Sequence, residues 1–171
     1  GIMEKSGITQ RLVDFADAVV GWITGGLAYV SIFSGMLMGG ISGSGPADTA
    51  ALGGILIPSM EKAGYPKEYA SATLAAAGSI GATIPPSITM VVLAGILSQS
   101  VGSMLMAGLI PGILIGVLMM VTSGVICHRR QYAISDKTEF SWNKLGRSLK
   151  NAVLALLAPI IIVGGIVAGI F

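Results

Sequence analysis

Charged residues are missing from long stretches of this chain, and those stretches are candidates for membrane segments. No Asp, Glu, Lys or Arg occurs in residues 69–128 or 151–171, and Asp48 is the only one in residues 18–60. A membrane-spanning helix needs about 20 consecutive apolar residues. The pattern therefore predicts an all-α membrane protein. The remaining charges fall into clusters at residues 4–17, 61–68 and 129–150.

Residues 1–22 predict an amphipathic helix that lies in the membrane interface. Ile8, Leu12 and Phe15 recur at helical spacing, with charged residues between them. Ser6 is a candidate N-cap, because its hydroxyl can accept a hydrogen bond from a free helix amide. Such a helix buries one apolar face at the acyl boundary and keeps its charges in water.

Residues 23–62 predict a re-entrant helical hairpin. Its apolar arms, residues 26–41 and 47–60, are each about 15 residues long and reach only ~22 Å, against ~30 Å of hydrocarbon. Ser42-Gly43-Ser44-Gly45-Pro46 lies between the arms. Because Gly and Pro are poor helix formers, the chain is expected to turn there and return to the same face of the membrane.

Residues 67–98 predict a transmembrane helix that is broken in its middle. The break follows from the sequence Gly78-Ser79-Ile80-Gly81-Ala82-Thr83-Ile84-Pro85-Pro86-Ser87. Proline removes a backbone donor and clashes with the preceding turn. Two consecutive prolines after two glycines therefore predict an unwound stretch rather than a mild kink.

The rest of the chain predicts a transmembrane helix at 104–128, a basic loop with an interfacial helix at 129–150, and the start of another span at 151–171. Counting the crossings places all three charged clusters, with all ten Lys and Arg, on one side. The positive-inside rule makes that side cytoplasmic. We expect a multi-pass protein of the cytoplasmic membrane that contacts the lipid bilayer.

Composition excludes several other classes of protein. Hydrophobic residues make up 53% of the chain and charged residues 11%, whereas soluble domains carry roughly 25% charged residues. The net charge of +2 and the lack of a groove-reading motif argue against a nucleic-acid partner. The single cysteine, Cys127, excludes a disulfide framework and a cysteine metal site within this chain.

Asp48 is the sharpest candidate for a functional residue. It is an acid alone in an apolar stretch, at the start of a half-helix. Ionisable residues inside a membrane are costly and mark functional sites by default. The structural alternative is an N-cap carboxylate satisfied by helix amides. The two roles are compatible, because a capping Asp can also face a cation.

The two helix breaks carry polar atoms that suit a cation and an anion. Unwound backbone is tolerated at membrane depth only where protein buries it or where it lines a watery cavity. Carbonyl and hydroxyl oxygens suit a small cation such as Na⁺, and the N-termini of half-helices favour a carboxylate. The alternative is that Gly, Ser and Pro only permit close helix packing. The hydroxyl groups near the breaks belong to Ser42, Ser44, Thr49, Ser79, Thr83 and Ser87.

We expect neither enzyme activity nor a cofactor. Gly40-Ile41-Ser42-Gly43 matches the G-x-S-G pattern of intramembrane serine proteases, but that chemistry needs a general base. The only histidine, His128, lies in the basic cluster at a helix end. Gly43-Ser44-Gly45 is not followed by the residues of a P-loop, so ATP hydrolysis is not expected.

Several motifs occur together, in order, over nearly the whole chain. They are Ser6-Gly7-Ile8 with Arg11-Leu12, Gly25-Gly26-Leu27-Ala28, Ile41-Ser42-Gly43-Ser44 through Ala47-Asp48, Gly64-Tyr65, Gly81-Ala82-Thr83-Ile84-Pro85-Pro86-Ser87 and Ala107-Gly108-Leu109-Ile110-Pro111-Gly112. In this the chain resembles the large membrane subunit of TRAP (tripartite ATP-independent periplasmic) transporters, the DctM-type permease of the ion-transporter superfamily. The pieces around Asp48 and around Pro85-Pro86 are the specific ones.

The resemblance implies one repeat of an inverted-repeat elevator transporter in the bacterial inner membrane. It implies Na⁺ as coupling ion, an organic acid as substrate, and two partners: a small membrane subunit (DctQ-type) and a periplasmic binding protein (DctP-type). Carried over to this chain, the Na⁺ site would use Ser42, Gly43, Ser44, Asp48, Ser79, Gly81 and Thr83. The substrate site would use Ser44, Thr83, Pro85 and Ser87.

The chain departs from the family in extent, and two alternatives stay open. A full subunit of this kind is far longer, so we expect a fragment that holds half a site, with no basic residue at membrane depth to pair with a carboxylate. The main alternative is a related ion-coupled carboxylate carrier that works without a binding protein. A channel or a purely structural membrane subunit is the third interpretation.

Overall fold

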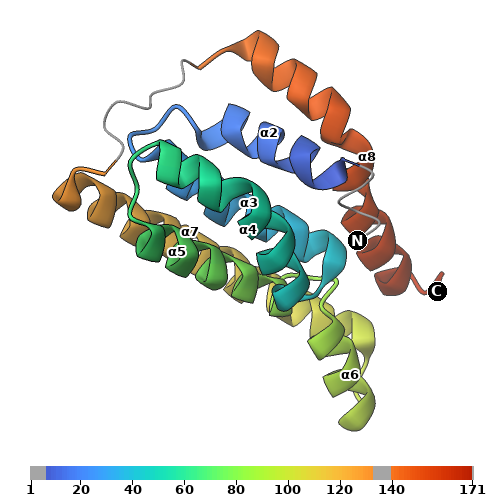
Figure 1. The fold of residues 1–171 in the computed structure, drawn as a ribbon. Coiled ribbons are helices and arrows are strands. Elements are labelled where there is room, and N and C mark those ends of the chain that lie inside the picture. The colour runs from blue at the N-terminus through green and yellow to red at the C-terminus, as the bar shows by residue number, and fades with distance from the viewer. Residues whose placement is uncertain (1–6, 133–139, 171) are drawn as a thin grey trace.

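The computed structural model describes residues 7–132 and 140–170, and the regular structure in these ranges is entirely helical. The prediction of an all-α chain is therefore confirmed for the described residues. Figure 1 shows the elements, which are α2 (Ile8–Val20), α3 (Gly26–Ser42), α4 (Gly45–Lys62), α5 (Lys67–Ser79), the 3₁₀ turn η1 (Ile80–Ala82), α6 (Ile88–Ile96), α7 (Val101–Arg130) and α8 (Trp142–Val167).

Helix α2 is amphipathic, as its sequence predicts. Leu12 and Ala16 are fully buried, whereas Arg11 and Asp14 are exposed. The buried stripe packs against α3 on one side and α8 on the other. The residue that precedes the helix is Gly7, in a left-handed conformation. Ser6, the predicted N-cap, lies outside the described residues.

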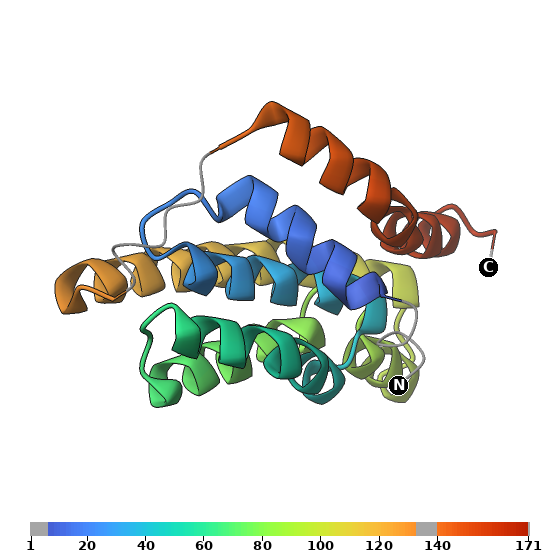
Figure 2. The same ribbon diagram turned by 45° about the horizontal axis from the view of Figure 1, so that its top comes forward.

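Helices α3 and α4 form a hairpin that packs on α5 (Figure 2). The predicted break at residues 42–46 is shorter in the structure, because only Gly43 and Ser44 are non-helical. Pro46 lies in the first turn of α4. A proline is tolerated there, since the first amides of a helix have no intrahelical acceptor. The hairpin therefore turns within two residues.

Helices α5 and α6 are separated by a non-α-helical stretch, as the double proline predicts. After α5 ends at Ser79, the chain makes the short turn η1, and α6 begins at Ile88. Figure 1 shows α6 leaving the body of the molecule at an angle to α5.

Helices α7 and α8 are the two that are long and apolar enough to cross a membrane among the described residues. The sequence predicts a short interfacial helix near Trp142–Lys150 and a separate span from residue 151. The structure instead has one continuous helix, α8, of 26 residues, with Pro159 inside it. Charged residues are tolerated in its first turns because they lie on an exposed face. Residues 133–139 and 171, which belong to the predicted loop and final span, lie outside the described residues.

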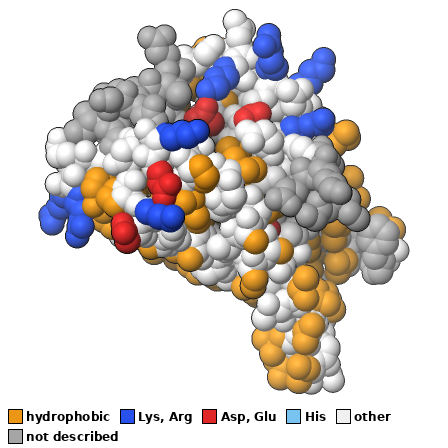
Figure 3. Space-filling view, in the orientation of Figure 1, with side chains coloured by type: hydrophobic (Ala, Val, Ile, Leu, Met, Phe, Trp, Pro, Cys, Tyr) orange, Lys and Arg blue, Asp and Glu red, His pale blue; other side chains and the backbone are white. Residues whose placement is uncertain are grey.

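Charged and apolar surfaces are separated. In Figure 3 the charged side chains gather on the upper and left parts of the molecule, whereas protruding α6 is hydrophobic. Many large apolar side chains on α6, α7 and α8 are exposed, among them Ile96, Ile110 and Leu154. Such a surface is typical of a chain covered by lipid or by further protein.

Candidate functional site

The tip of the α3–α4 hairpin lies directly against the break between η1 and α6. Gly43 adopts a left-handed φ of 62°, which ends α3 and favours glycine over residues with a side chain. A Cβ atom added at Gly43 would collide with the carbonyl oxygen of Pro86. The amide of Ile88 donates to the carbonyl of Gly43 at 3.4 Å. The two breaks that the sequence predicts therefore meet in space.

Asp48 is buried at this junction, with 1% of its surface exposed. Its Oδ1 accepts a hydrogen bond from the Ser42 hydroxyl at 2.5 Å, and that hydroxyl oxygen in turn accepts from the Ser44 amide at 3.1 Å. Its Oδ2 has no hydrogen-bond partner among the described residues. A Cβ atom added at Gly81 would lie 2.7 Å from Oδ2, so this oxygen faces the backbone of η1.

Asp48 is not the N-cap of α4, so that structural alternative is wrong as stated. The N-cap residue is Ser44, whose side chain makes no capping hydrogen bond. Asp48 lies one turn further on, where its own amide donates to the Ser44 carbonyl at 3.0 Å. The carboxylate therefore stands near the positive end of α4, but its recorded hydrogen-bond partner is a hydroxyl group of α3.

Backbone-to-backbone contact fixes the hairpin to the broken helix. A Cβ atom at Gly39 would lie 2.7 Å from the Cα of Gly81, and one at Gly45 would lie 2.8 Å from the carbonyl oxygen of Gly78. Side chains at these positions would force the segments apart. The small residues of the breaks thus serve packing and polar placement together, and the packing alternative describes part of their role.

An open pocket of about 700 Å³ lies beside the tip and the break. Gly43, Ser44 and Ser79 line it, and so do Thr49 and Thr89. Helix α4 begins at Gly45 and α6 begins at Ile88, and both of these residues also line the pocket. Thr89 is missed by the sequence analysis, although its place in the first turn after the double proline is a signal that could have found it.

Several predicted site residues, with Ser79 at the pocket among them, use their polar atoms in other contacts. The Ser87 hydroxyl donates to the Ala82 carbonyl at 2.6 Å and accepts from the Met90 amide at 3.4 Å, so it caps α6. The Ser79 hydroxyl donates to the Ala76 carbonyl at 2.7 Å. A Cβ atom at Gly108 of α7 would lie 2.5 Å from the Thr83 carbonyl oxygen, so that oxygen faces α7. Pro85 is buried and does not line the pocket.

The junction lies far from the charged end of α7. On α7, Gly112 lies next to the break, because a Cβ atom added there would lie 2.6 Å from Ile84. Cys127, near the charged end of α7, lies next to Gly25, where an added Cβ atom would be 2.9 Å from it. Fifteen residues separate the two contact points on α7, a distance of about 22 Å along a helix.

The same geometry separates the two residues of the protease interpretation. Ser42 ends α3, whose first residue follows Gly25, and the 17 residues of that helix span about 25 Å. His128 lies next to Cys127, at the Gly25 end. The histidine is therefore out of reach of Ser42 as a general base, which needs hydrogen-bond contact or one bridging water.

The comparisons with known proteins agree with the resemblance found in the sequence. A family model described as "Tripartite ATP-independent periplasmic transporter, DctM component" matches residues 1–171. The sialic acid TRAP transporter large permease of Vibrio cholerae is 41% identical over 170 residues, which cover 99% of this chain and 39% of that protein.

Two further relatives are named for substrates other than sialic acid. The C4-dicarboxylate TRAP transporter large permease of Pseudomonas aeruginosa is 39% identical over 169 residues, covering 99% of this chain and 39% of that protein. The isethionate TRAP transporter permease of Oleidesulfovibrio alaskensis is 38% identical over 175 residues, covering 98% and 26%. The chain thus spans about two-fifths or less of these curated relatives. Because the family match runs over its whole length, this chain belongs to the DctM component family of TRAP transporters, a family of membrane permeases.

Proposed function

We propose that this chain is part of the large permease subunit of a Na⁺-coupled TRAP transporter that imports an organic acid across the bacterial inner membrane. A periplasmic binding protein would deliver the acid, and a small membrane subunit would complete the permease. The observation that carries the proposal is the buried Asp48 carboxylate, with one oxygen hydrogen-bonded to Ser42 and the other without a hydrogen-bond partner in the described part of the chain.

The surroundings of Asp48 suit a small cation. A buried carboxylate without a compensating charge is costly. No Lys or Arg occurs within 12 residues of Asp48 on either side, and no ion pair of Asp48 is recorded among the described residues. A Na⁺ ion against Oδ2 would supply the missing charge, with the Ser42 hydroxyl and backbone carbonyls of the two breaks as further oxygen ligands.

The pocket beside the tip suits an anionic substrate. The N-termini of α4 and α6 both open onto it, and each brings the positive end of a helix dipole. The hydroxyl groups of Ser44 and Thr89 could orient carboxylate or hydroxyl oxygens, whereas the Thr49 hydroxyl already donates to the Gly45 carbonyl at 2.9 Å. The relatives named for sialic acid, C4-dicarboxylates and isethionate support an acidic substrate class.

We propose that the hairpin is re-entrant and moves with the broken helix as one unit. The distance of about 22 Å between the junction and the charged end of α7 supports a tip at membrane depth. The glycine contacts between Gly39 and Gly81 support common movement of hairpin and break. In an elevator mechanism this unit would cross the membrane against a scaffold that includes α2, α7 and α8.

The test is uptake by the full-length permease, reconstituted with its small subunit and binding protein. We expect a Na⁺ gradient to drive uptake, and Asp48→Asn to lower Na⁺-driven uptake by about tenfold or more, the size of a typical coupling between sites. Glu68→Gln is the matched control, because Glu68 is an exposed acid on α5. Equal uptake with and without the gradient would contradict the proposal.

The carrier that works without a binding protein is not favoured, because the family and the named relatives are components of TRAP systems. The same assay separates the two. Uptake of free substrate at the full rate, with the binding protein left out, would favour the simpler carrier.

A further inference from the structure

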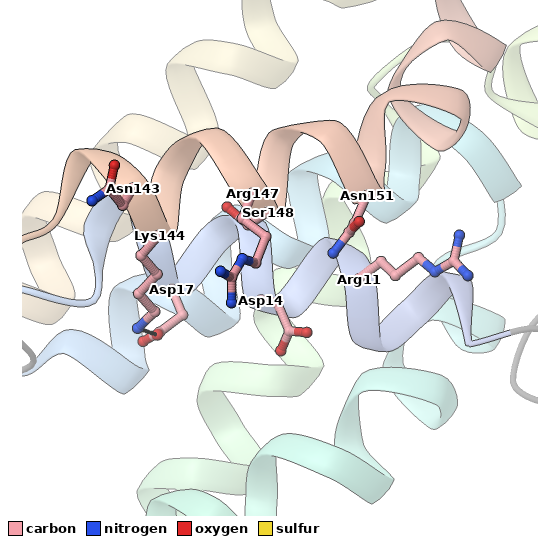
Figure 4. A pocket seen from close by; sticks show the side chains of 8 residues that line it. All are labelled: Arg11, Asp14, Asp17, Asn143, Lys144, Arg147, Ser148 and Asn151. Atoms are coloured by element: carbon pink, nitrogen blue, oxygen red, sulfur yellow. Dashed lines mark hydrogen bonds and ion pairs between the residues drawn. The ribbon is translucent and has the colours of Figure 1, made fainter.

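A second pocket, of about 390 Å³, lies between α2 and α8, away from the junction of the two breaks. Arg11, Asp14 and Asp17 line it from α2, and Lys144, Arg147 and Asn151 are the main residues that line it from α8 (Figure 4). Residues three or four apart lie on one face of a helix. The two helices therefore present facing polar stripes, and these stripes carry charges of both signs.

Only one end of this pocket is closed by an ion pair. Lys144 Nζ lies 2.5 Å from Asp17 Oδ2. The Asp14 carboxylate accepts a hydrogen bond from Gln10 at 2.9 Å and has no cationic partner among the described residues. Arg11 and Arg147 likewise form no ion pair within the described part of the chain. The pocket therefore offers the Arg147 guanidinium group and the Asp14 carboxylate to an occupant, whereas the Arg11 guanidinium points away from Arg147 along α2 (Figure 4).

The face of α8 that lines the pocket becomes apolar just beyond it. Leu154 follows Asn151 by three residues and is 78% exposed. Helix α8 is also long and apolar enough to cross a membrane. A charged pocket followed within one helical turn by an exposed apolar track matches the order of a phospholipid, which is headgroup first and acyl chain next.

We propose that this pocket binds the headgroup of phosphatidylethanolamine. The phosphate would lie against Arg147, because a guanidinium group matches phosphate oxygens in geometry and charge. The primary ammonium would donate to the Asp14 carboxylate. An anionic glycerol headgroup offers no cation to Asp14, and a choline headgroup has no N–H to donate. This assignment requires that the polar end of α8 lie at the membrane interface and is independent of the transported substrate.

Native mass spectrometry tests the proposal on the full-length permease with its small subunit. The complex is exposed to equal amounts of phosphatidylethanolamine, phosphatidylglycerol and phosphatidylcholine, and the retained lipid is counted. We expect phosphatidylethanolamine to be enriched. Arg147→Gln and Asp14→Asn should each lower its retention by about three- to tenfold, as for the loss of one partly exposed charge contact. Arg129→Gln, at the exposed end of α7 and outside the pocket, should leave retention unchanged.

Three results would overturn the proposal. The first is equal retention of the three lipids by the unaltered protein, a result that does not depend on any variant folding. The second is a preference for phosphatidylglycerol that Arg147→Gln abolishes and Asp14→Asn strengthens, which would mark an anionic-lipid site. The third is loss of the small subunit from the two variants at unchanged lipid content, which would assign the pocket to a protein contact.

Discussion

Asp48 and Asp17 are both aspartates within helices, yet their surroundings differ. Asp17 lies between α2 and α8 with 24% of its side chain exposed, and Lys144 neutralises it at 2.5 Å. Asp48 is 1% exposed, and its recorded partner is the hydroxyl group of Ser42. The first acid has its cation within the protein, whereas the second has an oxygen without a hydrogen-bond partner in residues 7–132 and 140–170.

The two acids differ because different segments of the chain pack against them. Asp17 faces α8, which begins in the basic cluster at residues 129–150, so Lys144 lies close enough to pair with it. Asp48 faces glycine backbone at η1, where a side chain of any length would collide. A lysine could not be placed there without separating the hairpin from the broken helix. The tight glycine packing therefore leaves no room for a cationic side chain at the η1 position that faces Asp48.

The largest effect is expected from Gly39→Ala, which tests whether this packing holds the Asp48 site together. The added methyl group would lie 2.7 Å from the Cα of Gly81, and backbone cannot move aside as a flexible side chain can. We expect a loss of about 1–3 kcal/mol in stability, measured as a lower unfolding temperature, together with loss of uptake. Gly54→Ala, also in a helix but with open space around it, should be neutral or stabilising. Equal effects of the two substitutions would show that the close approach is unimportant.

Ser42→Ala tests whether the hydroxyl group helps to form the cation site. The substitution removes the hydrogen bond to Oδ1 and one candidate oxygen ligand. We expect the apparent Na⁺ affinity of uptake to fall by about tenfold, as for loss of one hydrogen bond to a charged group. Ser59→Ala is the control, because its hydroxyl donates only to the Ile55 carbonyl within α4. An unchanged Na⁺ dependence in Ser42→Ala would remove Ser42 from the site.

Lys144→Gln should have the smallest effect. It leaves Asp17 without its ion pair, but Lys144 is 45% exposed and Asp17 is 24% exposed, so water can solvate the carboxylate. We expect a loss of at most about 1 kcal/mol in stability and no change in Na⁺ dependence. A loss of Na⁺-driven uptake as large as that of Asp48→Asn would contradict the proposal that Asp48, and not Asp17, belongs to the Na⁺ site.

The helix breaks could be predicted from sequence because Gly and Pro act locally. Pro85 and Pro86 disfavour a helix through their own geometry, and they lie in the non-helical stretch between η1 and α6. Gly43 and Ser44 form the hairpin turn within the predicted segment. The extent of the turn was overestimated, because Pro46 is compatible with the first turn of α4. Likewise, the charges of residues 142–150 suggested a separate helix, although an exposed face lets α8 carry them without interruption.

The arrangement of side chains around the site could not be predicted in the same way. The bond between Ser42 and Asp48 depends on the left-handed turn at Gly43, which redirects the chain between them. The role of Ser87 as the cap of α6 competes with a role as ligand, and the residue type suits both. The pocket between α2 and α8 brings together residues more than 120 positions apart in the sequence. A local sequence pattern cannot predict a contact of that range.

The most direct test of the account measures Na⁺ binding at Asp48 without transport. The unfolding temperature of the purified full-length permease complex would be compared in NaCl and KCl at equal ionic strength. A ligand that binds only the folded state stabilises it, so the unaltered protein should unfold at a higher temperature in NaCl. Asp48→Asn should unfold at the same temperature in both salts. An equal rise in NaCl for the unaltered protein and for Asp48→Asn would contradict the assignment of the cation site to this carboxylate.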